Sequence, residues 1–282
     1  MKLINKKTGI IFIIIGLIVI LVCTLSLNFA RIKSVFVTNT VSDIAYDVNS
    51  SYGYTIYIKE NNIYVPYLIL TNKYENTNMA LILRKDLIGT GEIDTTRKNC
   101  WGADSYIETK PFSEYDRYDK TKMDYYLNNN FIKLFDKKIS SIICKTNIKI
   151  ANNLEDSFYI SRKFFLLSTS ELGYFKYFNL LKLKWSYGYG GANDGKPLKY
   201  FGDSNDNRAT LEDEKTIIPW WTRTNGLTYY CAVGFNGGLI TESSTDEYYG
   251  VRPAFCIPNN TIIEKNDSII SGQAVYIIKN DK

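Results

Sequence analysis

The sequence predicts an α+β protein in which an N-terminal transmembrane helix precedes one mixed domain of strands and helices. An uncharged apolar run near the N-terminus is long enough to cross a bilayer. Segments rich in β-branched and aromatic residues lie at both ends of the remaining chain, and segments with helical spacing lie between them. We therefore expect a cytoplasmic arm, a transmembrane helix, a linker and a domain outside the cytoplasm, at residues 1–7, 8–30, 31–50 and 51–282.

The apolar run is preceded by three lysines and contains no charged residue. A cleaved signal peptide usually ends in small residues, whereas this run ends in Asn28-Phe29-Ala30, so an uncleaved anchor is favoured. The N-terminal lysines place the short arm in the cytoplasm, although basic residues also follow the run. The expected location is thus the cell membrane, with the membrane itself as a partner through residues 8–30.

Composition excludes several classes of site and partner. The chain of 282 residues is 45% hydrophobic, enough for a substantial core, and it has no histidine. The absence of histidine excludes Ser-His-Asp and Cys-His catalysis and histidine-ligated metals. The net charge is +5, and the three lysines before the apolar run supply more than half of it, so nucleic acid is not an expected partner.

The first part of the domain reads as a β-meander followed by short helices. Turn signals separate three apolar and aromatic segments, which predict strands at 52–59, 63–70 and 79–84. A helix is expected at 121–128, and helical spacing of apolar residues predicts a second between 131 and 143. The apolar run 164–167 predicts a strand. Ser168-Thr169-Ser170-Glu171 has a capping-box pattern, which predicts a helix running to about residue 184.

The last part returns to strands after a long polar loop. Residues 185–215 are rich in Gly, Asn and Asp and lack periodicity, which is typical of a surface loop that can carry function. Asn236-Gly237 is a strong hairpin signal. Strands are expected on both sides of that turn and nearer the C-terminus, at 217–223, 229–235, 238–241, 250–257 and 273–278.

Four cysteines lie in the expected external part. Cys231 and Cys256 belong to strands of one region, so we expect them to pair, which leaves Cys100 to pair with Cys144. Four cysteines allow three pairings, and four free buried thiols are an equal alternative. A copper or redox site is less favoured, because no closely spaced cysteine pair occurs.

Two aromatic and basic groups are candidate ligand-binding residues. Trp185, Tyr187 and Tyr189 lie in a Gly-rich stretch, where they form either a recognition loop or a loop entrance folded back on the domain. Trp220-Trp221-Thr222-Arg223 and the later Arg252 have two interpretations as well. Packing of the tryptophans with bracing by the arginines is favoured. The alternative is a surface formed by Trp221, Arg223 and Arg252 that binds sugars or anions.

The long loop also contains a possible calcium site. Asp203, Asn205, Asn207 and Glu214 have the spacing of oxygen ligands at positions one, three, five and twelve of a calcium loop. Arg208 stands where such a loop needs glycine, so an ordinary solvated turn is favoured. No cofactor is required by the sequence, and calcium is the one that the loop could bind.

An ordered set of motifs resembles a family of bacterial surface and secreted domains of unknown function, DUF6273. That family carries W-W-L-R-S-P followed by G-V-R-P-A-L, and the chain has Trp220-Trp221-Thr222-Arg223-Thr224 and Gly250-Val251-Arg252-Pro253-Ala254. Phe165-Leu166-Leu167-Ser168 with Glu171 resembles its F-L-L-S-x-x-E segment. Tyr126-Leu127-Asn128 with Phe131 resembles its W-L-N-x-x-F helix, and Tyr67-Leu68-Ile69-Leu70 its early strand. The resemblance implies a C-type-lectin-like fold, which formylglycine-generating enzymes share.

These observations favour a non-catalytic ligand-binding or adhesion module, anchored in the membrane and exposed on the surface of a bacterium. We expect it to present the loop 185–215 and the hairpin at Asn236-Gly237 to an extracellular glycan or protein. One alternative is an enzyme resembling the cysteine oxidases of the formylglycine-generating type, built on Cys231 and Cys256. Another is a structural subunit of a cell-envelope complex.

Overall fold

The computed structural model describes residues 39–48, 53–88, 117–151, 157–174, 194–202, 204–209, 217–225, 230–242, 249–270 and 273–279. The chain divides into two compact units, Met1–Asn39 and Thr40–Lys282, and the second contains the elements below. Among these described residues, strand residues (42%) far exceed helical residues (17%), so this part of the chain is mostly β-sheet with few helices. The predicted α+β class is therefore wrong.

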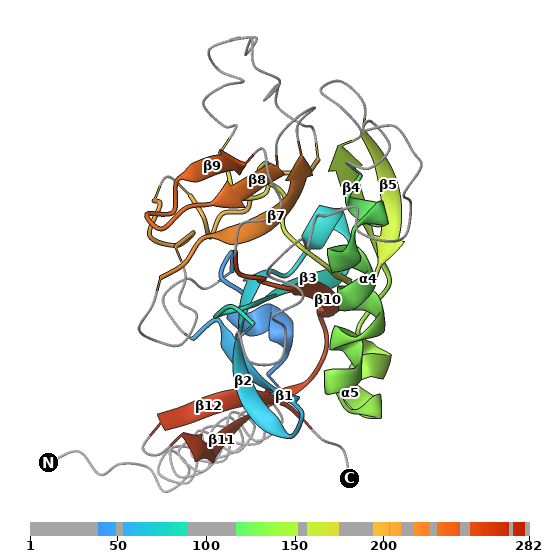
Figure 1. Ribbon diagram of the computed structural model, residues 1–282. Helices are drawn as coiled ribbons and strands as arrows, with labels where there is room; N and C mark the ends of the chain where they lie inside the picture. Colours follow the sequence, from blue (N-terminus) through green and yellow to red (C-terminus); the bar gives the residue numbers. More distant parts are fainter. Residues whose placement is uncertain are drawn as a thin grey trace, which may run out of the picture. The chain divides into compact units, whose positions relative to one another are not determined.

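A seven-stranded sheet forms the centre of this unit (Figure 1). Its strand order is β11-β12-β1-β2-β3-β10-β6. Strands β1 and β12 pair in parallel, and all other neighbours in the sheet are antiparallel. The first strand of the domain thus lies beside the last. The strands are β1 (Thr55–Glu60), β2 (Ile63–Thr71), β3 (Met79–Arg84), β6 (Phe164–Phe165), β10 (Ala254–Pro258), β11 (Ile263–Ile270) and β12 (Gln273–Ile278).

Two smaller sheets complete the strand content. Strands β7 (Trp220–Asn225), β8 (Tyr230–Val233) and β9 (Leu239–Glu242) form an antiparallel meander. Its β8–β9 hairpin turns at Asn236-Gly237 as predicted, with Gly237 at φ 71°. Strands β4 (Thr146–Ala151) and β5 (Ser157–Arg162) form a separate hairpin that the sequence analysis missed. Alternation was the available signal, because Ile148 and Ile150 are buried at every second position of β4.

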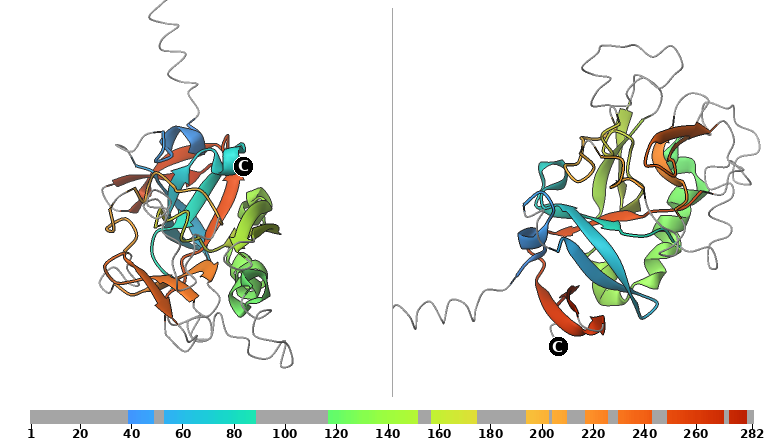
Figure 2. Two further views of the ribbon diagram at one scale, coloured as in Figure 1. Left: turned by 90° about the horizontal axis from the view of Figure 1, so that it is seen from above. Right: turned by 90° about the vertical axis from the view of Figure 1, so that its left-hand side faces the viewer.

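The helices among the described residues are short, which is the main reason why the class prediction failed. Two α-helices, α4 (Lys122–Asn129) and α5 (Lys137–Ile142), follow one another along one side of the central sheet (Figures 1 and 2). Thr121 and Asp136 cap them by accepting hydrogen bonds from main-chain N–H groups. The other helical segments in the described ranges are single 3-10 turns: η1 (Val41–Ile44), η2 (Tyr74–Asn76), η3 (Tyr118–Lys120) and η4 (Phe131–Leu134).

The long helix predicted after residue 168 is not present where it can be checked. Residues 169–174 form turns, and residues 175–184 lie outside the described residues. The capping box itself is real, since the Ser168 N–H donates to Glu171 Oε2 at 2.9 Å and the Glu171 N–H donates to Ser168 Oγ at 3.1 Å. The local motif was thus identified correctly, but the length of helix after it was not.

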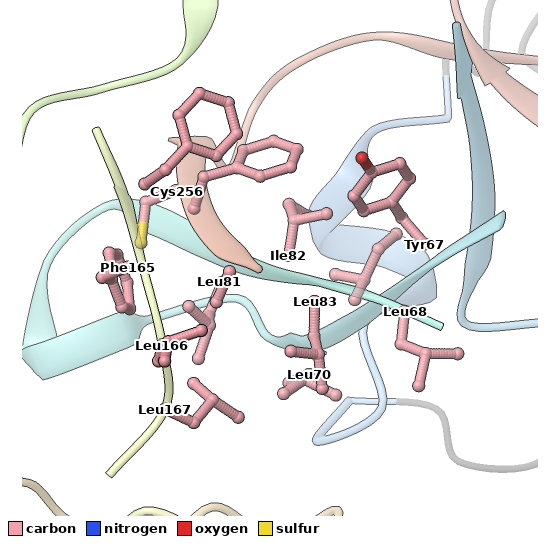
Figure 3. Packing of buried hydrophobic residues seen from close by; sticks show 14 of the residues in the cluster. Tyr67, Leu68, Leu70, Leu81, Ile82, Leu83, Phe165, Leu166, Leu167 and Cys256 are labelled. Atoms are coloured by element: carbon pink, nitrogen blue, oxygen red, sulfur yellow. The ribbon is translucent and has the colours of Figure 1, made fainter. Parts of the chain in front are cut away.

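The central core is continuous across the sheet and the segments packed on it. Tyr67 and Leu68 of β2, Leu81 of β3 and Cys256 of β10 lie in it, as does the strap of residues 165–167 that continues from β6 (Figure 3). All of these residues are buried. The apolar run at 164–167 is thus a core segment as expected, although only its first two residues pair as a strand.

The boundary of the domain lies earlier than predicted. Val41 and Ala45, which the sequence analysis placed in a linker at 31–50, are fully buried. The N–H of Val41 donates to the carbonyl of Thr261 at 2.9 Å, and that of Tyr46 donates to the carbonyl of Ile69 at 2.9 Å. This segment is therefore part of the folded unit.

The predicted membrane anchor receives no support from the structure. In the described part of the chain, no helix combines the length and the apolar character needed to cross a bilayer. The arm 1–7 and the predicted transmembrane helix 8–30 lie outside that part. The prediction of a single-pass protein of the cell membrane is corrected accordingly.

Candidate functional site

Arg223 on β7 is the most highly coordinated side chain that the structure describes. A guanidinium has five N–H bonds, and Arg223 uses each of them. Two donate to the Glu171 carboxylate at 2.6 and 2.8 Å. The other three donate to main-chain carbonyls of Lys149 (3.0 Å), Leu166 (2.8 Å) and Asp194 (2.7 Å). No N–H of this guanidinium is left for a ligand, so the prediction that Arg223 contacts one is wrong.

Glu171 links this arginine to the turn η2. The Arg223 and Glu171 side chains are both 0% exposed, and the Tyr74 hydroxyl donates to Glu171 Oε1 at 2.5 Å. Burial alone would lower the pKa of the Arg223 guanidinium, but the Glu171 carboxylate raises it above its usual range. Burial and Glu171 together raise the pKa of the Tyr74 hydroxyl. The arginine therefore stays charged and the tyrosine stays neutral.

A second carboxyl group, that of Asp194, lies beside the pair. Its Oδ2 accepts a hydrogen bond from the Thr224 hydroxyl, which itself accepts from the Thr169 N–H at 2.9 Å. Burial raises the pKa of the Asp194 carboxyl, although Arg223 opposes the rise. We call Tyr74, Glu171, Asp194, Arg223 and Thr224 the buried ion-pair cluster. Its hydrogen bonds join β7, the strap after β6 and the turn η2.

Arg252 has a different environment from Arg223. Its Nε donates to the Arg84 carbonyl at 3.0 Å, and its guanidinium lies 5.3 Å from the Trp220 ring centroid. Burial lowers the pKa of Arg252 to about 10, because no carboxylate forms an ion pair with it among the described residues. Its position in the core, at 2% exposure, contradicts the predicted contact with a ligand at the surface.

The two tryptophans are core residues. Trp220 and Trp221 are both fully buried. The Trp220 indole N–H donates to the Arg208 carbonyl at 2.9 Å, and the Trp221 ring lies 4.7 Å from that of Tyr249. An exposed stacking surface for sugars at Trp221 is therefore excluded, and the packing interpretation describes this motif correctly.

The predicted calcium loop is organised around Arg208, where a calcium loop would need glycine. Asn205 Oδ1 accepts a hydrogen bond from Arg208 Nη1 at 2.8 Å, and Asn207 Nδ2 donates to the Tyr200 carbonyl at 2.7 Å. Asp203 and Glu214, the two carboxylates of the prediction, lie outside the described residues. The described part of the turn is held by these hydrogen bonds, and calcium binding by the loop stays a prediction.

The remaining predicted ligand residues, Trp185, Tyr187 and Tyr189, also lie outside the described residues, so their contact with a ligand stays a prediction.

The cysteines do not follow the predicted pairing. Cys144, Cys231 and Cys256 are free thiols, and Cys100 lies outside the described residues. Cys231 is on β8 and Cys256 on β10, which belong to different sheets. The predicted disulfide between them is therefore wrong. Burial raises the pKa of the Cys231 thiol to about 12. The residue opposite Cys256 across an antiparallel bridge is Cys144.

A pocket of about 230 Å³, lined by both charged and apolar groups, opens beside the turn η2. Three lysines, Lys73, Lys196 and Lys199, line it together with the carboxylates of Asp47 and Glu75. The Asp47 carboxylate already accepts hydrogen bonds from the Thr71 hydroxyl at 2.6 Å and from the Asn72 main-chain N–H at 3.2 Å. None of the three ammonium groups forms an ion pair with a described carboxylate. Three ammonium groups and two carboxylates line the pocket, so its lining carries a net charge of +1.

The wall of this pocket has an unusual backbone. Glu75 and Asn76 have φ of 50° and 61°, in the left-handed region that residues other than glycine rarely adopt. Tyr74, immediately before them, is a member of the buried ion-pair cluster and also stacks on Phe165 with ring centroids 5.9 Å apart. Such a conformation persists only where the surroundings impose it. The core thus holds the pocket wall in place.

A second pocket of about 350 Å³ shares Glu75 with the first. It is lined further by residues of η2, β3, β4 and β5, which include Asn147 and Tyr159. Tyr159 is 60% exposed, so its ring is available to a ligand. The two pockets meet at η2 and form what we call the η2 groove.

The η2 groove was not predicted from the sequence. The lysines of its first pocket come from two segments more than a hundred positions apart, and Lys145 of its second pocket comes from a third, so only the fold brings them together. The motif Trp220 to Arg223 lies in the core instead, where Arg223 binds the Glu171 carboxylate that also accepts a hydrogen bond from Tyr74 of η2. The closely spaced Lys196 and Lys199 were the only local sequence signal for this site, and lysines spaced in this way are usually found in solvated loops.

Comparison with known proteins identifies the family without giving an activity. No curated protein and no solved structure matches the chain significantly, so the predicted C-type-lectin-like fold is not confirmed by either comparison. A family model described as a domain of unknown function, DUF6273, matches residues 77–259. That range contains Glu171, Arg223, Arg252 and both buried tryptophans. Because the match covers well over half of the chain, this protein belongs to the DUF6273 family.

Proposed function

We propose that this domain is a non-catalytic binding module that recognises an acidic glycan in the η2 groove. The observation that carries the proposal is the pocket in which Lys73, Lys196 and Lys199 outnumber two carboxylates and form no ion pair with a described carboxylate. A carboxylate or sulfate placed between these ammonium groups would gain Coulomb attraction from each of them.

The size of the pocket limits what it can hold. At about 230 Å³ it is smaller than the roughly 300–1,000 Å³ of pockets that enclose drug-sized ligands. It accommodates one charged group rather than a whole molecule. A polymer that places one acidic group in the pocket and continues along the surface satisfies this limit.

The neighbouring pocket favours a glycan over an acidic peptide. Tyr159 presents an exposed aromatic ring, and Thr77 and Asn147 contribute a hydroxyl and an amide. Sugar rings combine an apolar face with hydroxyl groups, and this mixture of aromatic and neutral polar side chains matches both. An acidic peptide would use the lysines but not the aromatic ring in this way.

Preorganisation supports binding at this place. The Tyr74 side chain anchors η2 to the buried ion-pair cluster, so the turn does not have to order when a ligand arrives. The Thr77 hydroxyl donates to the Tyr74 carbonyl at 2.6 Å and closes the turn from its other end. A pocket held in this way loses little conformational entropy on binding.

The alternative of a cysteine oxidase receives less support. Burial raises the pKa of the Cys231 thiol to about 12 and also raises that of Cys256. Because the thiolate is the reactive form of cysteine, both residues are poorly suited to redox catalysis near neutral pH.

The test is a binding screen of the full-length protein against acidic and neutral oligosaccharides, with poly-glutamate peptides as the competing class. We expect acidic oligosaccharides to bind and Lys73→Gln or Lys199→Gln to weaken binding about fivefold each, which corresponds to about 1 kcal/mol per ammonium at ~4 Å in water. Lys133→Gln, which removes an exposed lysine of η4 outside the pocket, is the matched control.

Rising salt is expected to weaken binding, because exposed charges are screened over about 8–10 Å at physiological ionic strength. If the peptides bind more tightly than the oligosaccharides, the ligand is an acidic protein and the proposed glycan is rejected. Equal affinity of the lysine variants and the control would reject the η2 groove as the site.

A further inference from the structure

We infer that Cys144 and Cys256 form a redox-sensitive cysteine pair that closes to a disulfide when the protein meets a small-molecule disulfide oxidant. This inference is independent of the proposed binding function. It replaces the disulfide between Cys231 and Cys256 that the sequence predicted, because these two residues lie in different sheets. It also gives a role to two thiols that the buried ion-pair cluster and the η2 groove do not use.

The backbone already brings the two residues into register. Cys144 and Cys256 are opposite one another in an antiparallel bridge, and the Cys144 N–H donates to the Cys256 carbonyl at 2.8 Å. Opposed residues of this kind have Cα atoms about 5.5 Å apart. Disulfides need a Cα separation of about 4.4–6.8 Å, so the bond can form without a shift of the backbone.

Side-chain direction is also suitable. Directly opposed residues of an antiparallel pair project to the same face of the sheet, so both thiols lie on one side of it. Consistent with this, Cys144 contributes to raising the pKa of the Cys256 thiol, after burial and against the effect of the Thr146 hydroxyl. The charge of one sulfur atom therefore affects the ionisation of the other across the bridge.

The difference in exposure sets the order of the reaction. Cys256 is fully buried, whereas Cys144 is only partly buried. Burial raises the pKa of the Cys144 thiol, against the effect of Lys163, and also raises that of Cys256, so both thiolates form at alkaline rather than neutral pH. The Cys144 thiolate attacks one sulfur of glutathione disulfide, which forms a mixed disulfide and releases one glutathione thiolate. The Cys256 thiolate then attacks Cys144 Sγ and displaces the second glutathione. The two protein thiols lose two protons and two electrons, and the oxidant is reduced to two glutathione molecules.

The bond would join parts of the molecule that are held together only by noncovalent contacts. Cys144 lies between α5 and β4, next to Lys145 and Thr146 of the second pocket, and Cys256 lies in the central sheet. The link would close a loop of roughly 110 residues, and long closed loops constrain the unfolded chain strongly. Oxidation is thus expected to stabilise the domain and to fix the β4 side of the η2 groove.

The experiment uses the reduced full-length protein, treated with glutathione disulfide at mildly alkaline pH, then acid-quenched, alkylated under denaturing conditions and digested without reductant. We expect mass spectrometry to find a Cys144–Cys256 cross-linked peptide with Cys231 alkylated. The thermal unfolding midpoint should rise by several degrees and return after reduction. Cys231→Ser, which removes the other buried thiol, should leave both results unchanged.

Cys144→Ser should abolish the cross-link and the rise of the midpoint. It is the preferred variant because the residue is only partly buried and its loss is less damaging to the core than that of Cys256. The inference is overturned if Cys144 and Cys256 are recovered separately alkylated. It is equally overturned if Cys144 is recovered with Cys100, or Cys256 with Cys231.

Discussion

Replacing Glu171 by glutamine should destabilise the domain more than any loss of an exposed ion pair. Glu171→Gln keeps the shape of the side chain but removes the charge that compensates Arg223. It also turns an amide donor toward a guanidinium that already donates two hydrogen bonds there, at 2.6 and 2.8 Å. Breaking one partner of a buried ion pair costs about 3–5 kcal/mol. Domains of this kind are stable by only about 5–15 kcal/mol, so the loss is large.

Urea unfolding followed by tryptophan fluorescence measures this effect, since Trp220 and Trp221 are buried in the native domain. With a slope of about 2 kcal/mol per molar urea, the midpoint should fall by about 2 M. Asp119→Asn is the matched control. It removes the carboxylate of a 2.8 Å pair in which the Arg117 side chain is 33% and the Asp119 side chain 10% exposed. Since solvent screens this pair more than one at 0% exposure, its loss should cost clearly less.

A double variant, Glu171→Leu with Arg223→Met, examines the rest of the network. Replacing both members of a buried pair by apolar residues is often neutral. Here it leaves the carbonyls of Lys149, Leu166 and Asp194 without their donors, and each unsatisfied buried group costs about 1–3 kcal/mol. We therefore expect no recovery of stability. A midpoint for Glu171→Gln equal to that of Asp119→Asn, or a double variant as stable as wild type, would refute this reasoning.

Two further predictions concern Asp194 and Gly237. Burial raises the pKa of the Asp194 carboxyl above 3.8, so between the unfolded and folded pKa values the folded state binds more protons and stability falls as pH rises. Asp194→Asn should flatten that slope, and an unchanged pH profile of urea midpoints would contradict it. Gly237→Ala should lower the midpoint strongly, because its Cβ would lie 1.9 Å from the Asn205 carbonyl oxygen at φ +71°. Gly202→Ala also has a positive φ but meets nothing closer than 3.6 Å, so similar losses for both would show that the close contact is unimportant.

The motifs found in the sequence converge on one region, which explains why they could be recognised separately but not interpreted. The Tyr67 ring of β2 lies 5.5 Å from Phe255 of β10, and Phe131 lies 5.1 Å from Phe164 of β6. Asn128 of α4 donates to the Phe164 carbonyl at 2.9 Å and so pairs with the edge of β6. Each motif is thus a contact surface for another one.

Local patterns determined local structure well. Alternation and turn chemistry located β2, β3 and the Asn236-Gly237 hairpin, and the Ser168–Glu171 capping box forms as its spacing requires. These features depend on neighbours within a few residues. The preferred interpretation of Trp220 to Arg223 as packing also holds. Large aromatic residues bury the most apolar surface in a core, and an arginine there can form a bidentate ion pair with a carboxylate.

Tertiary structure alone decided the balance of strand over helix, the placement of Cys144 opposite Cys256 and the position of the candidate site. Helical periodicity cannot determine whether a segment forms a helix or only turns, as residues 169–174 do. The opposition of Cys144 and Cys256 and the gathering of Lys73 with Lys196 and Lys199 join residues far apart in the chain. Such contacts depend on strand order and register, which arise from burial of the whole core rather than from any local preference.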